Sequence, residues 1–121
     1  MRVLLADDNP EVRAALRLLI EQQPGCAVCG EAGDAVQLLA LCARLCPDVI
    51  VLDAELAGLP AHRRGAALIE LAQTLRRLCP AARLAALSSF EVDAKAPWIR
   101  SMDAAFLKTD PPDDLLAFLR S

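Results

Sequence analysis

The 121-residue sequence predicts an α/β fold, a doubly wound five-stranded parallel sheet with helices on both faces. Strand-like and helix-like segments alternate five times, which is the order that gives parallel strands joined by helical crossovers. The run Val49–Leu52 is apolar without alternation and rich in β-branched residues, as in a central strand covered on both faces. Aromatic residues make up only 3% of the chain, so the core must be built from Leu, Ala and Val.

Bulk properties narrow the class of protein. A chain of this length suffices for one compact domain, residues 1–121, and is too short for two. The net charge of −3 offers no basic surface for nucleic acid, so direct binding of DNA is not expected. Charged residues interrupt every apolar stretch before it reaches membrane-spanning length, and the chain opens with a strand rather than a signal peptide. A cytoplasmic protein without membrane contact is predicted.

The first strand is predicted at Arg2–Ala6. Asn9 is a good N-cap, and Pro10 fits the first turn of a helix that runs to about Gln22. Helical spacing places three apolar residues on the inner face of this helix: Val12, Leu16 and Leu19. A weaker second strand is expected at Cys26–Gly30.

Asp34 is the expected cap of a second helix, which Pro47 closes just before the central strand. The core face of this helix is expected to hold Leu38, Leu41, Cys42 and Leu45. After the central strand, the loop Ala54–Arg63 leads to a third helix that Pro80 ends. Its inward-facing residues are predicted to be Leu68, Leu71, Leu75 and Leu78. The fourth strand is predicted at Arg83–Leu87.

The last third of the chain is more irregular. Pro97-Trp98-Ile99 predicts a short, reduced fourth helix, and the fifth strand is expected at Ala104–Leu107. Asp110 is the expected cap of the fifth helix, with Pro111 in its first position and acidic residues in its first turn. The residues that anchor this helix are predicted to be Leu115, Leu116 and Leu119.

Four of the five cysteines superficially resemble a zinc-binding spacing, Cys26-x-x-Cys29 followed by Cys42-x-x-x-Cys46. Cys26 and Cys29 lie in or beside a strand, where positions three apart point to opposite faces. Cys42 and Cys46 lie one helical turn apart, where they serve as small core residues. Reduced thiols are therefore expected, with zinc or a disulfide as the less favoured alternatives.

Polar residues end each of four predicted strands. The first strand is followed by Asp7 and Asp8, and the third ends at Asp53. The fourth strand is followed by Ser88 and the fifth by Lys108. A doubly wound order brings the carboxyl ends of these strands together, where open α/β sheets bind their ligands. Three carboxylates in one cleft repel each other, and a hard cation such as Mg²⁺ removes the conflict.

The same residues suit an incoming phosphoryl group. Mg²⁺ and the Lys108 ammonium would neutralise charge on the phosphoryl oxygens, and Ser88 would donate a hydrogen bond to them. Asp53 is then the nucleophile, and an aspartyl-phosphate forms.

This constellation resembles the receiver domain of two-component response regulators, and the resemblance covers nearly the whole chain. It implies the flavodoxin-like strand order 2-1-3-4-5. It also implies that Asp53 takes its phosphoryl group from a sensor histidine kinase or a phosphotransfer protein. Such a domain catalyses only its own phosphotransfer and autodephosphorylation, and is not otherwise an enzyme.

The resemblance further implies roles for the site residues. Asp8, Asp53 and the backbone carbonyl of Glu55 would contact Mg²⁺ directly, with Asp7 acting partly through water. Ser88 and Lys108 would hold the phosphoryl oxygens.

The ending Lys-Thr-Asp-Pro-Pro-Asp-Asp-Leu-Leu is more like receivers joined to helix-turn-helix output domains. An output domain is then absent or removed here, and DNA contact and control of transcription would come through it. Phosphorylation would rearrange the surface formed by the fourth helix, fifth strand and fifth helix, through which a homodimer or an effector would bind.

Three departures from the family pattern matter: the loop after Asp53, the place of the switch aromatic, and a slightly short, polar stretch between Ser88 and Lys108 that suggests a reduced or mobile fourth helix. Leu56-Ala57 replaces the usual Met-Pro, and the loop to Gly65 looks about four residues too long. The segment His62–Arg64 in that loop is either a solvated helix start or a basic lip that attracts the phosphoryl donor. The family's switch aromatic falls on Ala105, while Phe106 stands one residue later, so either the strand carries a bulge or Phe106 only packs in the core.

Two further aromatic residues are singled out. Phe90, two residues after Ser88, flanks the path of the hydrolytic water in receivers, and we expect it to slow loss of the phosphoryl group. Trp98 is interpreted as a packing residue, with a partner-surface anchor as the sharper alternative.

The altered loop and the displaced aromatic motivate a second function. The chain would then be a pseudo-receiver, a protein-interaction module that no longer switches on phosphorylation. A hydrolase with an Asp nucleophile is a weaker third reading, because Asp7-Asp8-Asn9 lacks the second acid such enzymes carry two residues after the first.

Overall fold

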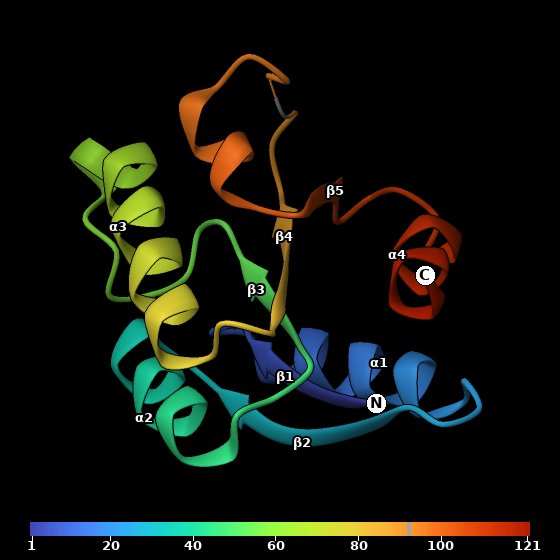
Figure 1. Ribbon diagram of the computed structural model, residues 1–121. Helices are drawn as coiled ribbons and strands as arrows, with labels where there is room; N and C mark the ends of the chain where they lie inside the picture. The colour runs from blue at the N-terminus through green and yellow to red at the C-terminus, as the bar shows by residue number, and fades with distance from the viewer. Residues whose placement is uncertain (92) are drawn as a thin grey trace.

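The computed structural model describes residues 1–91 and 93–121 and contains a five-stranded sheet of order β2-β1-β3-β4-β5 (Figure 1). All four strand pairs are parallel. The predicted fold class is therefore confirmed, including the strand order. The strands are β1 (Arg2–Ala6), β2 (Ala27–Ala32), β3 (Val49–Asp53), β4 (Arg83–Ser88) and β5 (Ala104–Leu107).

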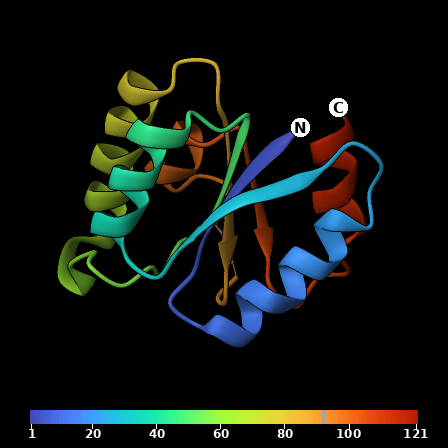
Figure 2. The same ribbon diagram turned by 90° about the horizontal axis from the view of Figure 1, so that it is seen from below.

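Four α-helices and two 3₁₀ helices connect the strands. The α-helices are α1 (Pro10–Glu21), α2 (Ala35–Leu45), α3 (Arg64–Leu78) and α4 (Asp113–Arg120). The 3₁₀ helices are η1 (Ala61–Arg63) and η2 (Pro97–Ser101). The short fourth helix predicted at Pro97 is thus η2, and the predicted fifth helix carries the label α4. Figure 2 shows α2 and α3 on one side of the sheet and α1 and α4 on the other.

The sheet separates two apolar layers. Alternate residues of the strands point to opposite faces, so Leu4 and Ile50 join the core beneath α2 and α3. Val3 and Val51 join the core beneath α1 and α4. Every residue of β3 is buried, as the uninterrupted apolar run predicts for a central strand.

Two of the three caps expected from the sequence are present. The Asn9 side chain accepts hydrogen bonds from the backbone N–H groups of Glu11 (2.9 Å) and Val12 (3.4 Å). The Asp34 carboxylate accepts one from the Gln37 N–H at 2.8 Å. These bonds satisfy donors that the first turn of a helix cannot pair internally, and they fix where α1 and α2 begin.

The third cap, at the last helix, was predicted wrongly. Asp110 and Pro111 precede α4, which begins at Asp113 with Pro112 as its N-cap. The reason is the double proline: Pro112 disfavours the helical conformation at the residue before it, so Pro111 cannot start the helix. Leu115 and Leu119 are buried as expected.

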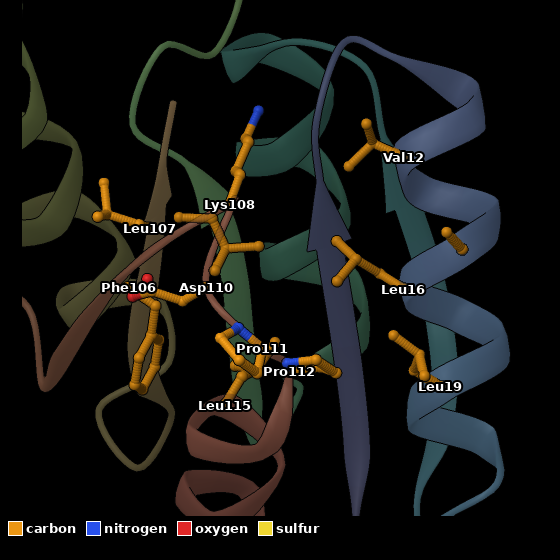
Figure 3. A pocket seen from close by; sticks show the side chains of 12 residues that line it. Val12, Leu16, Leu19, Phe106, Leu107, Lys108, Asp110, Pro111, Pro112 and Leu115 are labelled. Carbon is orange, nitrogen blue, oxygen red and sulfur yellow. The ribbon is translucent and has the colours of Figure 1, made fainter. Parts of the chain in front are cut away.

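The late start of α4 leaves a cavity of about 300 Å³ between α1 and the segment joining β5 to α4 (Figure 3). The predicted inner face of α1 lines this cavity through Val12, Leu16 and Leu19, which are only partly buried. The fully buried residue of α1 is Ile20. The predicted face therefore points inward, but it borders a groove rather than a closed core.

Two other boundaries differ from the prediction. Strand β2 extends to Ala32, and its pairing with β1 shifts register between Val3 and Leu4. In α3, Leu68, Leu71 and Leu75 are buried, whereas Leu78 is 38% exposed and was wrongly predicted to face inward. The next residue, Cys79, fills the core position four residues after Leu75 and is 5% exposed.

Within residues 1–91 and 93–121, helices fall short of the length and apolar content that a membrane crossing requires.

Candidate functional site

Three carboxylates meet at the carboxyl ends of β1 and β3. Asp7 and Asp8 directly follow β1, and Asp53 is the last residue of β3. One oxygen from each of these side chains lies within 4.8 Å of the others. Asp7 is 2% exposed and Asp53 3%, whereas Asp8 is exposed. The three acids that the sequence predicted to share a cleft are therefore brought together.

Lys108, which follows β5, provides the positive charge of the cluster. Its Nζ lies 3.1 Å from Asp7 Oδ2 and 3.1 Å from Asp53 Oδ2. The Lys108 N–H donates to the Ser88 carbonyl at 2.8 Å, which ties the segment after β5 to the end of β4. One ammonium thus bridges two buried carboxylates that come from different strands.

The electrostatics of the cluster follow from burial. Burial raises the pKa of Asp53, and the nearby Asp7 charge adds to this, while the Glu55 N–H and Lys108 act against it. Burial acts to lower the pKa of Lys108, but its contacts with Asp7 and Asp53 outweigh this effect and raise it. The lysine therefore stays charged, and it favours the ionised form of Asp53.

The oxygen atoms of these acids are unequally paired. Asp7 Oδ1 accepts a hydrogen bond from the Asn9 N–H, and Asp53 Oδ1 accepts one from the Glu55 N–H, both at 2.9 Å. Asp7 Oδ2 is buried and finds no hydrogen-bond partner in the described part of the chain, because its contact with Lys108 is an ion pair without hydrogen-bond geometry. An ion pair alone leaves part of the cost of burying this carboxylate oxygen uncompensated. A hard cation would satisfy it, so the triad could bind a metal ion.

Ser88 ends β4 and is 5% exposed. Its hydroxyl lies 3.0 Å from Glu55 Oε2 and also contacts the backbone of Phe90. The second oxygen of Glu55 accepts a hydrogen bond from the Ser89 N–H at 2.8 Å. The Ser88 hydroxyl is therefore held by Glu55, at the end of the strand next to β3.

Sequence reasoning missed the contact between the Glu55 carboxylate and Ser88, since Glu55 was expected only to offer its backbone carbonyl to Mg²⁺ and, with Phe90, to flank the path of the hydrolytic water. The available signal was topological. Glu55 and Ser89 follow neighbouring strands, and β3 and β4 pair in register up to Asp53 and Leu87. Which way the Glu55 side chain turns depends on the loop after β3, whose local sequence leaves it open.

The position of the switch aromatic is now defined. Residues of β4 and β5 pair one for one, with Ala86 opposite Ala105 and Leu87 opposite Phe106. The suggested bulge in β5 is therefore wrong. Phe106 packs edge-on against Phe118 of α4, with ring centroids 6.2 Å apart, and Ala105 faces the α2–α3 side of the sheet. Phe106 is a packing residue on the opposite face from the switch position.

The long loop after β3 contains η1 and ends at α3. His62 and Arg63 are exposed, and Arg63 pairs with Glu70 at 3.3 Å. Arg64 lines a second cavity of about 280 Å³, which also borders Ser88 and Trp98. Trp98 is partly buried and packs against the core beneath α2 and α3, which agrees with its interpretation as a packing residue.

The fold and the acidic site define the class of protein. Residues 3–120 match the response regulator receiver domain, and the chain belongs to that family.

Individual relatives make the assignment more specific. The nitrate/nitrite response regulator protein NarL of Escherichia coli (strain K12) is 32% identical over 119 residues, which cover 97% of this chain and 52% of that protein. The chain thus spans about half the length of the curated relatives it matches.

Solved structures agree. A two-component response regulator of the LuxR family from Aurantimonas sp. SI85-9A1 has a TM-score of 0.82 and 30% identity, covering 98% of this chain and 81% of that one. The isolated receiver domain of RcsB from Salmonella enterica serovar Typhimurium, solved in the presence of the phosphomimetic BeF₃⁻, has a TM-score of 0.82 and 26% identity. That match covers 99% of this chain and 86% of that one.

Proposed function

We propose that this receiver domain accepts a phosphoryl group on Asp53 from a sensor histidine kinase or a phosphotransfer protein and thereby switches a partner or dimer surface. The observation that carries the proposal is the Lys108 ammonium, 3.1 Å from both Asp53 and Asp7 in a cluster of buried acids. A cation that bridges two carboxylates at a strand end is placed to hold an anionic group next to Asp53.

The metal fits the same residues. The groups that would hold Mg²⁺ are Asp7, Asp8, Asp53 and the backbone carbonyl of Glu55. Asp7 Oδ2, which accepts no hydrogen bond in the described part of the chain, supports this assignment, since oxygen ligands of this kind suit Mg²⁺. When bound, Mg²⁺ would neutralise negative charge on the phosphoryl oxygens.

Asp53, Lys108 and Ser88 carry the other steps of the phosphotransfer. A carboxylate oxygen of Asp53 forms the new bond to phosphorus as the bond from phosphorus to the donor's imidazole nitrogen breaks, and the imidazole keeps the electron pair. The Lys108 ammonium moves from the Asp53 carboxylate to a phosphoryl oxygen. The Ser88 hydroxyl donates a hydrogen bond to a second phosphoryl oxygen. To do so, the hydroxyl must give up its contact with Glu55.

The output of the switch lies beyond this domain. Relatives such as NarL are response regulators about twice as long as this chain. In a full-length protein, control of transcription and contact with DNA would pass through an output domain. Within this domain we assign only phosphotransfer to Asp53 and its reversal by autodephosphorylation.

The test is incubation with acetyl phosphate and Mg²⁺, followed by intact-mass measurement. We expect the mass of one phosphoryl group to be added to the wild-type protein and to Asp48→Asn, and to be lost in Asp53→Asn. Asp48 is a matched control, because it lies just before β3 and its carboxylate accepts a hydrogen bond from the Arg2 N–H at 2.7 Å. Absence of any addition to the wild-type protein overturns the proposal.

One observation favours the second candidate, the pseudo-receiver. The position of the switch aromatic is occupied by Ala105 in a strand that pairs without a bulge. A receiver without that side chain would keep its binding surface but lose the coupling to Asp53. Unphosphorylatable wild-type protein that still binds its partner would support this candidate instead.

A further inference from the structure

Three of the five cysteines converge at the edge of the sheet opposite the acidic site. Cys42 lies in the last turn of α2, Cys46 is the C-cap of α2, and Cys79 is the C-cap of α3. The acids lie at the carboxyl ends of the strands, whereas Cys46 and Cys79 directly precede the connections that enter β3 and β4. In Figures 1 and 2, α2 and α3 lie side by side. The thiols are therefore remote from the chemistry of Asp53.

The thiol of Cys79 touches Cys42. The two sulfur atoms are 3.0 Å apart, and Cys79 Sγ lies 3.1 Å from the backbone carbonyl oxygen of Cys42. Cys42 is fully buried and Cys79 is 5% exposed, whereas Cys46 is exposed. All three carry free thiols. A pair of buried thiols in contact, one helical turn from an exposed cysteine, is an arrangement that core packing alone does not require.

We propose that Cys42 and Cys79 form a reversible disulfide, and that Cys46 is the thiol through which a small disulfide oxidant, such as oxidised glutathione, reaches them. The sequence spacing had drawn attention to Cys26, Cys29, Cys42 and Cys46. The structure pairs Cys42 with Cys79 instead.

The geometry permits the bond. A disulfide has its sulfur atoms about 2.0 Å apart, so the two thiols must approach each other by roughly 1 Å. Cys42 is fixed within α2. Cys79 lies just outside α3, with φ −136° and ψ 77°, at the start of a turn that the Ala82 N–H closes onto its carbonyl. The movement can therefore be made by Cys79 without unwinding a helix.

The buried pair is protected from direct attack. Burial and contacts with the Cys42 and Cys46 thiols raise the pKa of Cys79 to about 12, and burial raises the pKa of Cys42. Since the thiolate is the reactive form, neither residue attacks an oxidant in free solution readily, and Cys79 reacts only with a disulfide held next to it on Cys46. Cys46 is exposed, and its backbone N–H donates to the same Cys42 carbonyl that Cys79 Sγ contacts, both at 3.1 Å, so it lies between the solvent and the buried pair.

The reaction balances through three exchanges. The Cys46 thiolate attacks oxidised glutathione, forming a mixed disulfide and releasing one glutathione thiolate. Cys79 then attacks the Cys46 sulfur and releases the second glutathione, and Cys42 attacks Cys79 and regenerates the Cys46 thiol. In total, two protein thiols are oxidised to the Cys42–Cys79 disulfide, and one glutathione disulfide is reduced to two thiols that take up the two protons.

A shared metal ion fits these thiols less well. Sulfur ligands of one ion must all lie close to one another. Among the residues that the structure describes, the group of metal-ligating side chains that meets within 4.8 Å is the acidic triad, and the three thiols do not form a second such group.

The test uses the whole chain under native conditions with oxidised glutathione, followed by acid quench, alkylation and peptide mapping. We expect the mass to fall by two hydrogen atoms, the alkylated thiols to fall from five to three, and the cross-linked peptides to contain Cys42 and Cys79. The melting temperature should rise by several degrees, because a cross-link spanning 37 residues restricts the unfolded chain, and dithiothreitol should reverse the rise.

Two variants test whether the oxidant reaches the buried thiols through Cys46. Cys46→Ser should slow formation of the disulfide severalfold, whereas Cys26→Ser, at a half-buried thiol on the opposite face of the sheet, should leave the rate unchanged. Five thiols that remain alkylatable after oxidation overturn the proposal, as does a cross-link between other cysteines or a glutathione adduct that persists on Cys46. An unchanged rate in Cys46→Ser removes Cys46 from the route. None of these results depends on whether Asp53 accepts a phosphoryl group.

Discussion

At the scale of single residues, Asp53 is a buried carboxyl group whose protonation affects the stability of the fold. It is 3% exposed and lies next to a second buried acid, and its pKa is raised above the ordinary value of 3.8 mainly by burial. A folded protein that holds a proton more tightly than its unfolded chain loses stability as pH rises through that window. The ionised carboxylate is thus a cost to the stability of the fold.

Replacing Asp53 by Asn removes this cost. Without Mg²⁺, we expect Asp53→Asn to melt at a higher temperature than the wild-type protein at neutral pH. The difference should shrink as pH falls through the raised pKa of Asp53 and vanish below 3.8, where the wild-type carboxyl is protonated in both states. Thermal melts across this pH range, with Asp48→Asn as the control, measure the effect. A less stable Asp53→Asn protein at neutral pH would contradict it.

Phe90 is the second residue with a consequence for the site. It is 68% exposed, and its backbone contacts the Ser88 hydroxyl. We expect Phe90→Ala to shorten the lifetime of the phosphorylated protein severalfold, because the ring would shield the aspartyl-phosphate from water. The decay of phosphoryl mass measures this lifetime. Leu18→Ala, at a 64% exposed residue on α1, should leave it unchanged, and an equal or longer lifetime in Phe90→Ala rules out shielding.

At the scale of elements, the apolar spacing of a helix predicts burial in its middle but not at its end. Leu75 and Leu78 both follow the apolar spacing of α3, yet Leu75 is fully buried and Leu78 is 38% exposed. The helix ends at Leu78, and the chain turns there so that Cys79 enters the core. A leucine at this spacing therefore contributes more to the free energy of unfolding in the middle of the helix than at its end.

The two leucines form a matched pair for measurement. Leu75→Ala should lower the free energy of unfolding by about 2–5 kcal/mol, the usual cost of a cavity in a core. Leu78→Ala should change it by no more than about 0.5 kcal/mol, as at most surface positions. Urea denaturation of both variants measures these values. Similar losses in the two variants would mean that Leu78 is buried in solution.

At the scale of the whole molecule, three segments distant in the chain build one charged site. Asp7 and Asp8 follow β1, Asp53 ends β3 and Lys108 follows β5. The neutralising cation in the described structure is Lys108 at 3.1 Å, one positive charge against three acids. Filling this site with a divalent cation should stabilise the entire fold, since the ion binds the folded chain and the unfolded chain has no assembled site.

Mg²⁺ should therefore raise the melting temperature of the wild-type protein. At a concentration 100 times the dissociation constant, the gain is about 2.7 kcal/mol. Asp8→Asn should lose most of this gain, because it removes a charged ligand that is exposed and not needed for packing. Asp114→Asn, an exposed acid on α4, should keep it. Melts at equal ionic strength distinguish binding from screening, and an equal rise in both variants would contradict specific binding.

The strand order was implied by the family resemblance, whereas the residue patterns predicted a parallel α/β sheet, the positions of all five strands to within a few residues, and the five side chains that follow or end them. These features depend on local patterns: a β-branched apolar run, a capping Asn or Asp, and a proline that stops a helix. The tertiary structure alone showed that Glu55 holds the Ser88 hydroxyl, that Cys42 contacts Cys79, and that Leu78 turns to solvent. Each of these features depends on how the chain turns where a strand or helix ends and on which distant segment it meets there, and local sequence does not encode that.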